Sequence, residues 1–163
     1  MSLICDYFVA GSDEEAAATA GWPGGPGTPP AGRRGLFRRA AETGGAPLPT
    51  EALPGLDPVV MLGTLEALLT GGSADDLVAA NADAQVNEEA AAVLVFRLSD
   101  TLTGALAGAP AERLRQVADP WSRTEELAGD GDPAVLAEAL QRLAQLAQQA
   151  RSTGGRLYCW TSP

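Results

Sequence analysis

The sequence predicts an α+β fold, in which a small sheet of about three strands is covered by five or six helices. Three short apolar segments have the composition and alternation of strands, and they lie at residues 3–9, 93–98 and 156–161, at the start, middle and end of the chain. Capping residues, prolines at first helical positions and glycine stops mark helices between them. We therefore expect residues 1–163 to form a single domain, with an irregular Gly/Pro-rich insertion at about 21–56.

The first segment, LICDYFV, predicts a strand that is apolar on both faces and therefore covered on both. Period-two alternation divides its side chains between the faces. One face has Leu3, Cys5, Tyr7 and Val9, and the other has Ile4, Asp6 and Phe8. Ser12 then begins a short helix, and Glu15 completes a capping-box pattern.

The insertion starts with GWPGGPGTPPAG, in which nine of twelve residues are Gly or Pro. Glycine costs backbone entropy and proline removes a hydrogen-bond donor, so no regular element is expected there. A single helical turn around residues 36–41 is the one interruption that we expect before residue 56. A loop of this length is either functional or disordered, and we favour disorder or a loosely held surface crossing.

Start and stop signals define the middle of the chain. Asp57 followed by Pro58 predicts a helix start, and Gly71-Gly72 its end. An apolar stripe lies between them, formed by Met61, Leu62, Leu65, Leu68 and Leu69. Ser73 begins a further short helix, and the strand segment VLVFRL follows at residues 93–98.

The last third of the chain predicts three helices and a strand. Ser99 or Asp100 caps a helix that ends near Gly108, and the next begins at Pro110 and is broken at Asp119-Pro120. Residues 121–127 are expected to add a further turn or two. Asp132-Pro133 then begins the longest helix, residues 133–152, which Gly154-Gly155 ends before the strand at 156–161.

Charge and residue usage exclude several classes of function. The net charge is −10, and the chain contains neither Lys nor His. An acidic surface argues against nucleic acid and anionic membranes as partners, and it favours a basic protein partner. Without His, the Ser-His-Asp and Cys-His catalytic arrangements and His-ligated metals are excluded, so we expect no cofactor, no metal and no enzymatic activity. No apolar stretch is long enough to span a membrane and no signal peptide is recognisable, so we expect a cytoplasmic location.

Six residues are the candidate binding residues: Trp22, Asp6, and the cluster Arg33, Arg34, Arg38 and Arg39. The four arginines could hold an anion or an acidic segment, but we prefer pairing with the protein's own acidic surface. Asp6 is the one acid inside an apolar strand, and we prefer a hydrogen-bonded carboxylate at the sheet margin over an acid or base. Trp22 is the tryptophan that could be an exposed binding residue.

Cys5 and Cys159 each lie in a predicted terminal strand, and those two strands are possible neighbours in the sheet. A disulfide between them would close most of the chain into one loop. In the expected compartment, two buried, reduced thiols that act as small apolar side chains are the preferred interpretation.

The order of these elements resembles the YfbM-like family of bacterial proteins of unknown function. The matching residues are the opening aromatic strand LICDYF and a helix that closes on Leu68, Leu69, Thr70 and Gly71. The chain also resembles an actinobacterial protein group through Leu56, Asp57, Pro58, Leu62, Gly63 and the closing LYCW at 157–160. The resemblance implies an α+β fold and carries over no catalytic residue.

Three hypotheses for function follow. The leading one is a non-enzymatic interaction or regulatory module, immunity-like in that it binds a basic partner. The second is a small-molecule-binding module that uses the Gly/Pro loop and the Arg cluster, which predicts a concave pocket near Asp6 or those arginines. The third is a carboxylate-dependent enzyme.

Overall fold

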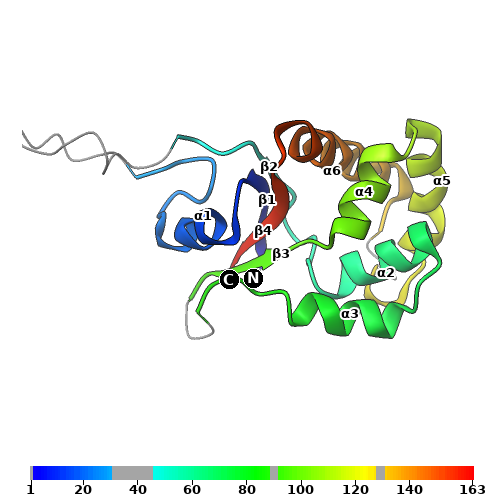
Figure 1. Cartoon of the computed structure of the whole chain (residues 1–163). Coiled ribbons are helices and arrows are strands. Elements are labelled where there is room, and N and C mark those ends of the chain that lie inside the picture. Colours follow the sequence, from blue (N-terminus) through cyan, green and yellow to red (C-terminus); the bar gives the residue numbers. More distant parts are fainter. Residues whose placement is uncertain (1, 31–45, 89–91, 128–130) are drawn as a thin grey trace, which may run out of the picture.

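The computed structural model describes residues 2–30, 46–88, 92–127 and 131–163. Its described part is an α+β fold in which a four-stranded antiparallel sheet separates one short helix from a layer of longer ones (Figure 1). The strands are β1 (Ile4–Ala10), β2 (Thr50–Ala52), β3 (Leu94–Arg97) and β4 (Arg156–Ser162). The α-helices are α1 (Asp13–Ala18), α2 (Val60–Thr70), α3 (Ala74–Ala82), α4 (Asp100–Gly108), α5 (Ala111–Ser122) and α6 (Pro133–Thr153). Two short 3-10 helices, η1 (Thr19–Gly21) and η2 (Glu125–Leu127), complete the list.

The sheet has the strand order β2-β1-β4-β3, and every neighbouring pair is antiparallel. Its central pair is β1 with β4, in register from Ile4 opposite Ser162 to Ala10 opposite Arg156. The two ends of the described chain therefore lie side by side (Figure 1). The first and last strands, which the sequence left as possible neighbours, are paired.

Strand β2 is a fourth strand, inside the region expected to be irregular. Its three residues follow Pro49, and Pro54 comes soon after them. Three residues are too few to show an alternating pattern, and proline near a strand indicates an edge or a turn. The strand forms because β1 pairs with it, Tyr7 opposite Glu51, and a long-range pairing of this kind leaves no local signal.

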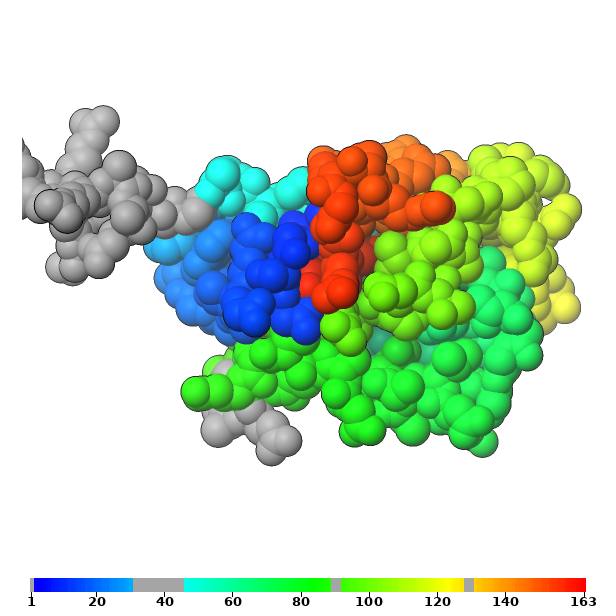
Figure 2. All heavy atoms as spheres, in the orientation of Figure 1, coloured from blue at the N-terminus to red at the C-terminus, as the bar shows by residue number. Residues whose placement is uncertain are grey.

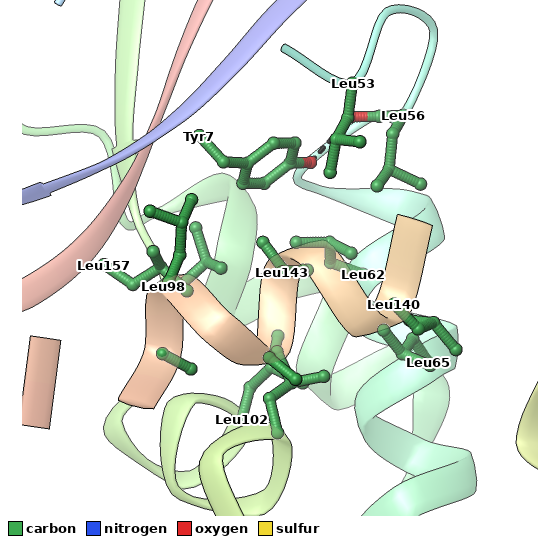
Figure 3. Close-up of a cluster of buried hydrophobic side chains, with 14 of the residues drawn as sticks. Tyr7, Leu53, Leu56, Leu62, Leu65, Leu98, Leu102, Leu140, Leu143 and Leu157 are labelled. Carbon is green, nitrogen blue, oxygen red and sulfur yellow. Dashed lines mark hydrogen bonds between the residues drawn. The ribbon is translucent and has the colours of Figure 1, made fainter. Parts of the chain in front are cut away.

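The two faces of β1 and β4 divide as expected. Leucine-rich helices cover the face that carries Cys5, Tyr7, Leu157 and Cys159, and α6 contacts the sheet there (Figure 1). Tyr7 points from the sheet toward the loop after β2, and its hydroxyl donates a 2.6 Å hydrogen bond to the carbonyl of Leu56 (Figure 3). Fully buried leucines fill the space beneath, among them Leu62, Leu65, Leu140 and Leu143.

The opposite face carries a smaller core that is built around three aromatic side chains and is covered by α1, η1 and the Gly/Pro loop. Phe8, Tyr158 and Trp160 are buried there, and the rings of Phe8 and Tyr158 stack 5.6 Å apart. Polar bonds attach the cover: the Tyr158 hydroxyl donates to Asp13 Oδ1 at 2.7 Å, and Trp160 Nε1 donates to the Thr19 carbonyl at 3.1 Å.

The described parts of the insertion are hydrogen-bonded to one another and to the sheet. Gly25 has a left-handed φ of 72°, and its N–H donates to the Trp22 carbonyl at 3.0 Å. The Leu48 N–H donates to the Pro26 carbonyl at 3.1 Å, which joins the two sides of the insertion. The helical turn expected around residues 36–41 lies outside the described residues.

Two helix boundaries differ from the sequence predictions. Asp57 Oδ1 accepts from the N–H groups of Val59 and Val60, so α2 begins at Val60 and residues 57–59 form the turn before it. The expectation that Asp119-Pro120 breaks the helix is wrong, because α5 continues through Pro120 to Ser122. The proline removes one backbone bond in the last turn. The next residue, Trp121, is fully buried and donates to the Met61 carbonyl, which offsets that loss.

Candidate functional site

A groove of about 490 Å³ lies where the loop after β2 meets α2, η2 and the first half of α6. Its floor is apolar and largely buried, and it consists of Leu53, Leu56, Met61, Leu127 and Leu136. Val135 stands on the wall and is 61% exposed, which is high for a branched apolar side chain. Concave sites of this size with an apolar lining are the kind that bind small molecules or the side chains of a partner.

Charged side chains form the rim of the groove. Glu126, Glu138 and Arg142 line it. The carboxylate of Glu126 accepts a short hydrogen bond from the Thr64 hydroxyl, whereas Glu138 is exposed on α6. Arg142 is already engaged, because its Nη2 lies 2.6 Å from the Glu51 carboxylate. The rim is therefore negative toward an incoming group.

The walls of the groove are fixed by the surrounding fold. Gly55 has a φ of 79°, and its N–H donates to the Leu3 carbonyl at 2.9 Å, so the loop turns sharply back against β1. The Tyr7 hydroxyl holds the next carbonyl, that of Leu56. On the opposite wall, Trp121 Nε1 donates to the Met61 carbonyl at 3.1 Å. Hydrogen-bonded backbone thus fixes the loop after β2 and the Met61 position, from which part of the groove lining projects.

Asp6 lies on the other face of the sheet and does not line the groove. It stands between Ala52 of β2 and Trp160 of β4, and a Cβ placed on Gly25 would lie 3.1 Å from its carboxylate. Burial raises the pKa of the Asp6 carboxyl above its ordinary value. The preferred position at a sheet margin is only partly met, because β1 is a central strand with a single short strand outside it.

Trp22 is the other predicted binding residue within the described ranges, and it does not line the groove. It is half-buried at the end of η1, where its backbone N–H donates to the Thr19 carbonyl. Arg33, Arg34, Arg38 and Arg39 lie outside the described residues.

The two cysteines are free, fully buried and on neighbouring strands. Cys159 stands opposite Tyr7 in the register, and Cys5 is the next residue of β1 on the same face. Burial raises the pKa of the Cys159 thiol well above its ordinary value, and it raises the pKa of Tyr7 in the same way. These residues behave as core side chains, as the preferred interpretation held.

Two further polar clusters have structural explanations. Glu66 is 2% exposed, and its Oε1 accepts from the Ser99 hydroxyl at 2.8 Å, at the positive end of α4. Within the described residues its Oε2 has no hydrogen-bond partner. Asp13 pairs with Arg97 at 3.3 Å and accepts from Tyr158, which ties α1 to β3 and β4. Both clusters join elements of the fold, and neither opens into the groove.

Sequence reasoning did not identify the groove residues. Helix α6 has one buried stripe, through Leu136, Leu140 and Leu143. The signal that could have indicated the groove is a second, shorter stripe on the same helix. Val135, Ala139 and Arg142 recur at helical spacing beside the buried stripe, and all three line the groove.

Comparisons with protein-family models, curated proteins and solved structures found no match. The resemblance to the YfbM-like family therefore stays a prediction. Among the described helices, none is both long and apolar enough to cross a membrane. Within the same described ranges, no three Cys, Asp or Glu side chains are arranged to hold a metal ion.

Proposed function

We propose that this protein is a non-enzymatic interaction module that binds a basic segment of a protein partner in the groove. The observation that carries the proposal is the combination of an apolar floor with a negative rim. The floor offers burial to apolar side chains, at roughly 25 cal/mol per Å² of surface removed from water. The rim carboxylates of Glu126 and Glu138 favour a cationic segment over an acidic one.

The charge of the whole molecule supports the same partner class. A net charge of −10 attracts a basic protein at long range and increases its association rate. The same charge opposes nucleic acid and anionic membranes, which we propose are not partners. A chain without His or Lys and with two buried free thiols is consistent with a binding role in the cytoplasm, which is the location that we propose.

A small-molecule ligand is the second candidate. The groove volume of about 490 Å³ lies in the range of such sites, and this observation favours the candidate independently of charge. The role proposed from sequence for the Gly/Pro loop would place a second contact region near Asp6, on the other face of the sheet. The Arg cluster of that proposal lies outside the described residues. A small cationic apolar ligand and a basic peptide segment differ in the length of protein surface they occupy.

Selection from a display library of linear peptides tests the proposed function. We expect the selected peptides to be rich in Arg or Lys and in apolar residues. We expect them to bind the Val135→Arg/Glu138→Arg variant at least about tenfold more weakly than the natural protein. Both positions are exposed, so the variant should keep the thermal stability of the natural protein.

Asp83→Arg is the control for charge reversal, because it makes the same acid-to-Arg change as Glu138→Arg at an exposed position on the end of α3, outside the groove. It should retain most of the binding. The proposal is wrong if no peptide is enriched, or if the selected peptides bind the groove variant and the control equally well.

A further inference from the structure

We infer that the partner segment binds in an extended conformation, as an added strand on the free edge of β2, with its apolar side chains in the groove. The inference rests on the proposed function and deepens it by naming the conformation and sequence pattern of the partner. Binding by strand addition uses backbone hydrogen bonds for affinity and pockets for alternate side chains for specificity. The edge, the groove and the charge around them each support this inference.

Strand β2 has one side committed to β1 and one side turned outward. The register pairs Glu51 with Tyr7, and the Leu53 N–H donates to the Cys5 carbonyl at 2.9 Å. In an antiparallel pair, backbone groups alternate between the neighbour and the opposite side. The N–H and C=O groups of Thr50 and Ala52 therefore point away from the sheet.

Three of these four outward groups have no hydrogen-bond partner, backbone or side chain, among the described residues. They are the N–H and C=O of Thr50 and the N–H of Ala52. The Ala52 carbonyl accepts from Arg142 Nη2 at 3.3 Å. Arg142 also binds Glu51. This side chain of α6 therefore occupies the Ala52 end of the outward edge, which is the end nearest the groove. A short extended segment can satisfy the three remaining groups.

The opposite edge of the sheet is closed, which makes the open edge specific to β2. Residues 84–87 run along β3, where the Val86 N–H donates to the Val95 carbonyl at 2.8 Å. The Arg97 N–H donates to the Ala84 carbonyl, and the side chain of Asn87 accepts from the Val95 N–H. Proteins commonly cover or shorten edge strands to prevent unwanted pairing. Here β3 is covered. At β2 the Leu48 N–H donates to the Pro26 carbonyl at one end and Arg142 binds the Ala52 carbonyl at the other, and among the described residues no strand pairs with the outward side between them.

The groove lies where alternate side chains of the added strand would point. Directly opposite residues in antiparallel strands share a face. Glu51 is on the same face as Tyr7, the face covered by α6. A segment paired beside β2 therefore directs every second side chain toward the groove, whose lining begins at Ala52 and Leu53. Those positions should be apolar.

The intervening side chains point to the face that carries Asp6. Asp6 stands opposite Ala52, so a residue added beside Ala52 lies in the same cross-strand row. Two strand spacings separate it from Asp6, about 10 Å in total. Ala52 offers only a methyl group between them, and an extended Arg side chain is long enough to approach a carboxylate across it. The inferred ligand is thus a segment in which apolar and basic residues alternate.

The test uses one defined probe, the fluorescent peptide acetyl-Arg-Val-Arg-Leu-Arg-Val-Arg-amide, measured by anisotropy against the full chain. The variant Ala52→Pro removes an outward N–H, and proline is tolerated on an edge strand where its nitrogen faces solvent. We expect this variant to bind the probe at least about tenfold more weakly. The control Ala52→Val adds similar bulk and keeps the N–H, and it should bind nearly as well as the natural protein.

N-methylation of the peptide gives an independent readout that does not alter the protein. The peptide has two alternating sets of amides, one on each edge. Methylation of the set that faces β2 should abolish binding, and methylation of the other set should leave binding largely unchanged, because only one edge of the peptide pairs with β2. The inference is overturned if Ala52→Pro and Ala52→Val bind the probe equally well, or if methylation of either set of amides has the same effect. So would failure of the probe to bind.

The peptide library distinguishes a failure of the inferred strand addition from a failure of the proposed function. If library peptides depend on the groove but have apolar residues at three- and four-residue spacing, the partner binds as a helix. The proposed function then stands and the inferred strand addition is wrong. If no library peptide depends on the groove, both are wrong.

Discussion

The two faces of the sheet are stabilised in different ways. Four helices cover one face with a leucine-rich core, whereas a six-residue helix, a 3-10 turn and a Gly/Pro loop cover the other. Figure 2 shows the same division, with the N-terminal segment on one side of the last strand and the larger mass of helices on the other. The helical face buries mostly aliphatic side chains. The α1 face buries a few aromatic rings and attaches its cover through polar bonds.

This difference indicates which face of the sheet contributes most to stability and where a partner can bind. Burial of apolar surface is the dominant favourable term in folding, so the helical face supplies most of the stability. The α1 face contributes fewer buried groups and more directional contacts. Strand β2 lies at the edge where the two covers meet, and within the described residues no further strand pairs with its outward side. The candidate site therefore lies at the boundary of a rigid core and a thinner cover.

The largest expected effect comes from a cavity in the helical core. Leu143 is fully buried on α6, and Leu143→Ala should lower the free energy of unfolding by about 2–5 kcal/mol, as core leucine truncations do. On the other face, Leu48 is only partly buried against the aromatic core, so Leu48→Ala should cost clearly less. Urea denaturation of both variants measures the two values. Equal losses would contradict the assignment of stability to the helical face.

Two tyrosines give a finer comparison of the faces. Tyr7→Phe leaves the Leu56 carbonyl without its buried hydrogen bond and should cost about 1–3 kcal/mol of unfolding free energy. Tyr158→Phe removes a bond to Asp13, a side chain that is 38% exposed and can be solvated by water instead. Its cost should be smaller. A larger loss for Tyr158→Phe, in the same denaturation assay, would show that the α1 cover is the more tightly coupled face.

The smallest expected effect depends on pH. Burial raises the pKa of Asp6, so the folded state holds this proton to a higher pH than the unfolded state does. The contribution of the protonated Asp6 carboxyl to the free energy of unfolding is complete below about pH 4. It decreases as the pH rises through the pKa that this carboxyl has in the folded state. Asp6→Asn should therefore gain stability relative to the natural protein between acidic and neutral pH.

Urea midpoints across that pH range measure the effect. If the stability of the natural protein instead increases relative to that of Asp6→Asn as the pH rises, the ionised carboxylate has a stabilising partner. Burial would then not be what sets the pKa of Asp6. Glu88→Gln is the control, because it makes the corresponding amide substitution at an exposed position.

The sequence was most informative where local signals and burial coincide. The α+β class, the division of side chains on β1 and β4, and helix α6 followed from alternation, caps and glycine stops. The fourth strand was missed because β2 has three residues and owes its pairing to β1. The continuation of α5 through Pro120 was missed because burial of Trp121 decides it, and burial is a property of the folded chain.

The candidate site was harder to predict for a related reason. Asp6 and Trp22 stand out in the sequence by residue type, but the groove is lined by ordinary residues from four separate segments. Only tertiary packing brings Leu53, Glu126 and Val135 together, and no single segment has a motif. A groove built from such residues can be found only after the elements are assembled.

Amide chemical-shift mapping by NMR with the alternating Arg/Val/Leu peptide shows whether the partner segment binds at the β2 edge and the groove. We expect shifts at Thr50 and Ala52 on the edge of β2 and at Val135 and Ala139 on α6, with little change along α1. Shifts confined to the α1 face, or spread evenly over the acidic surface, would contradict this expectation.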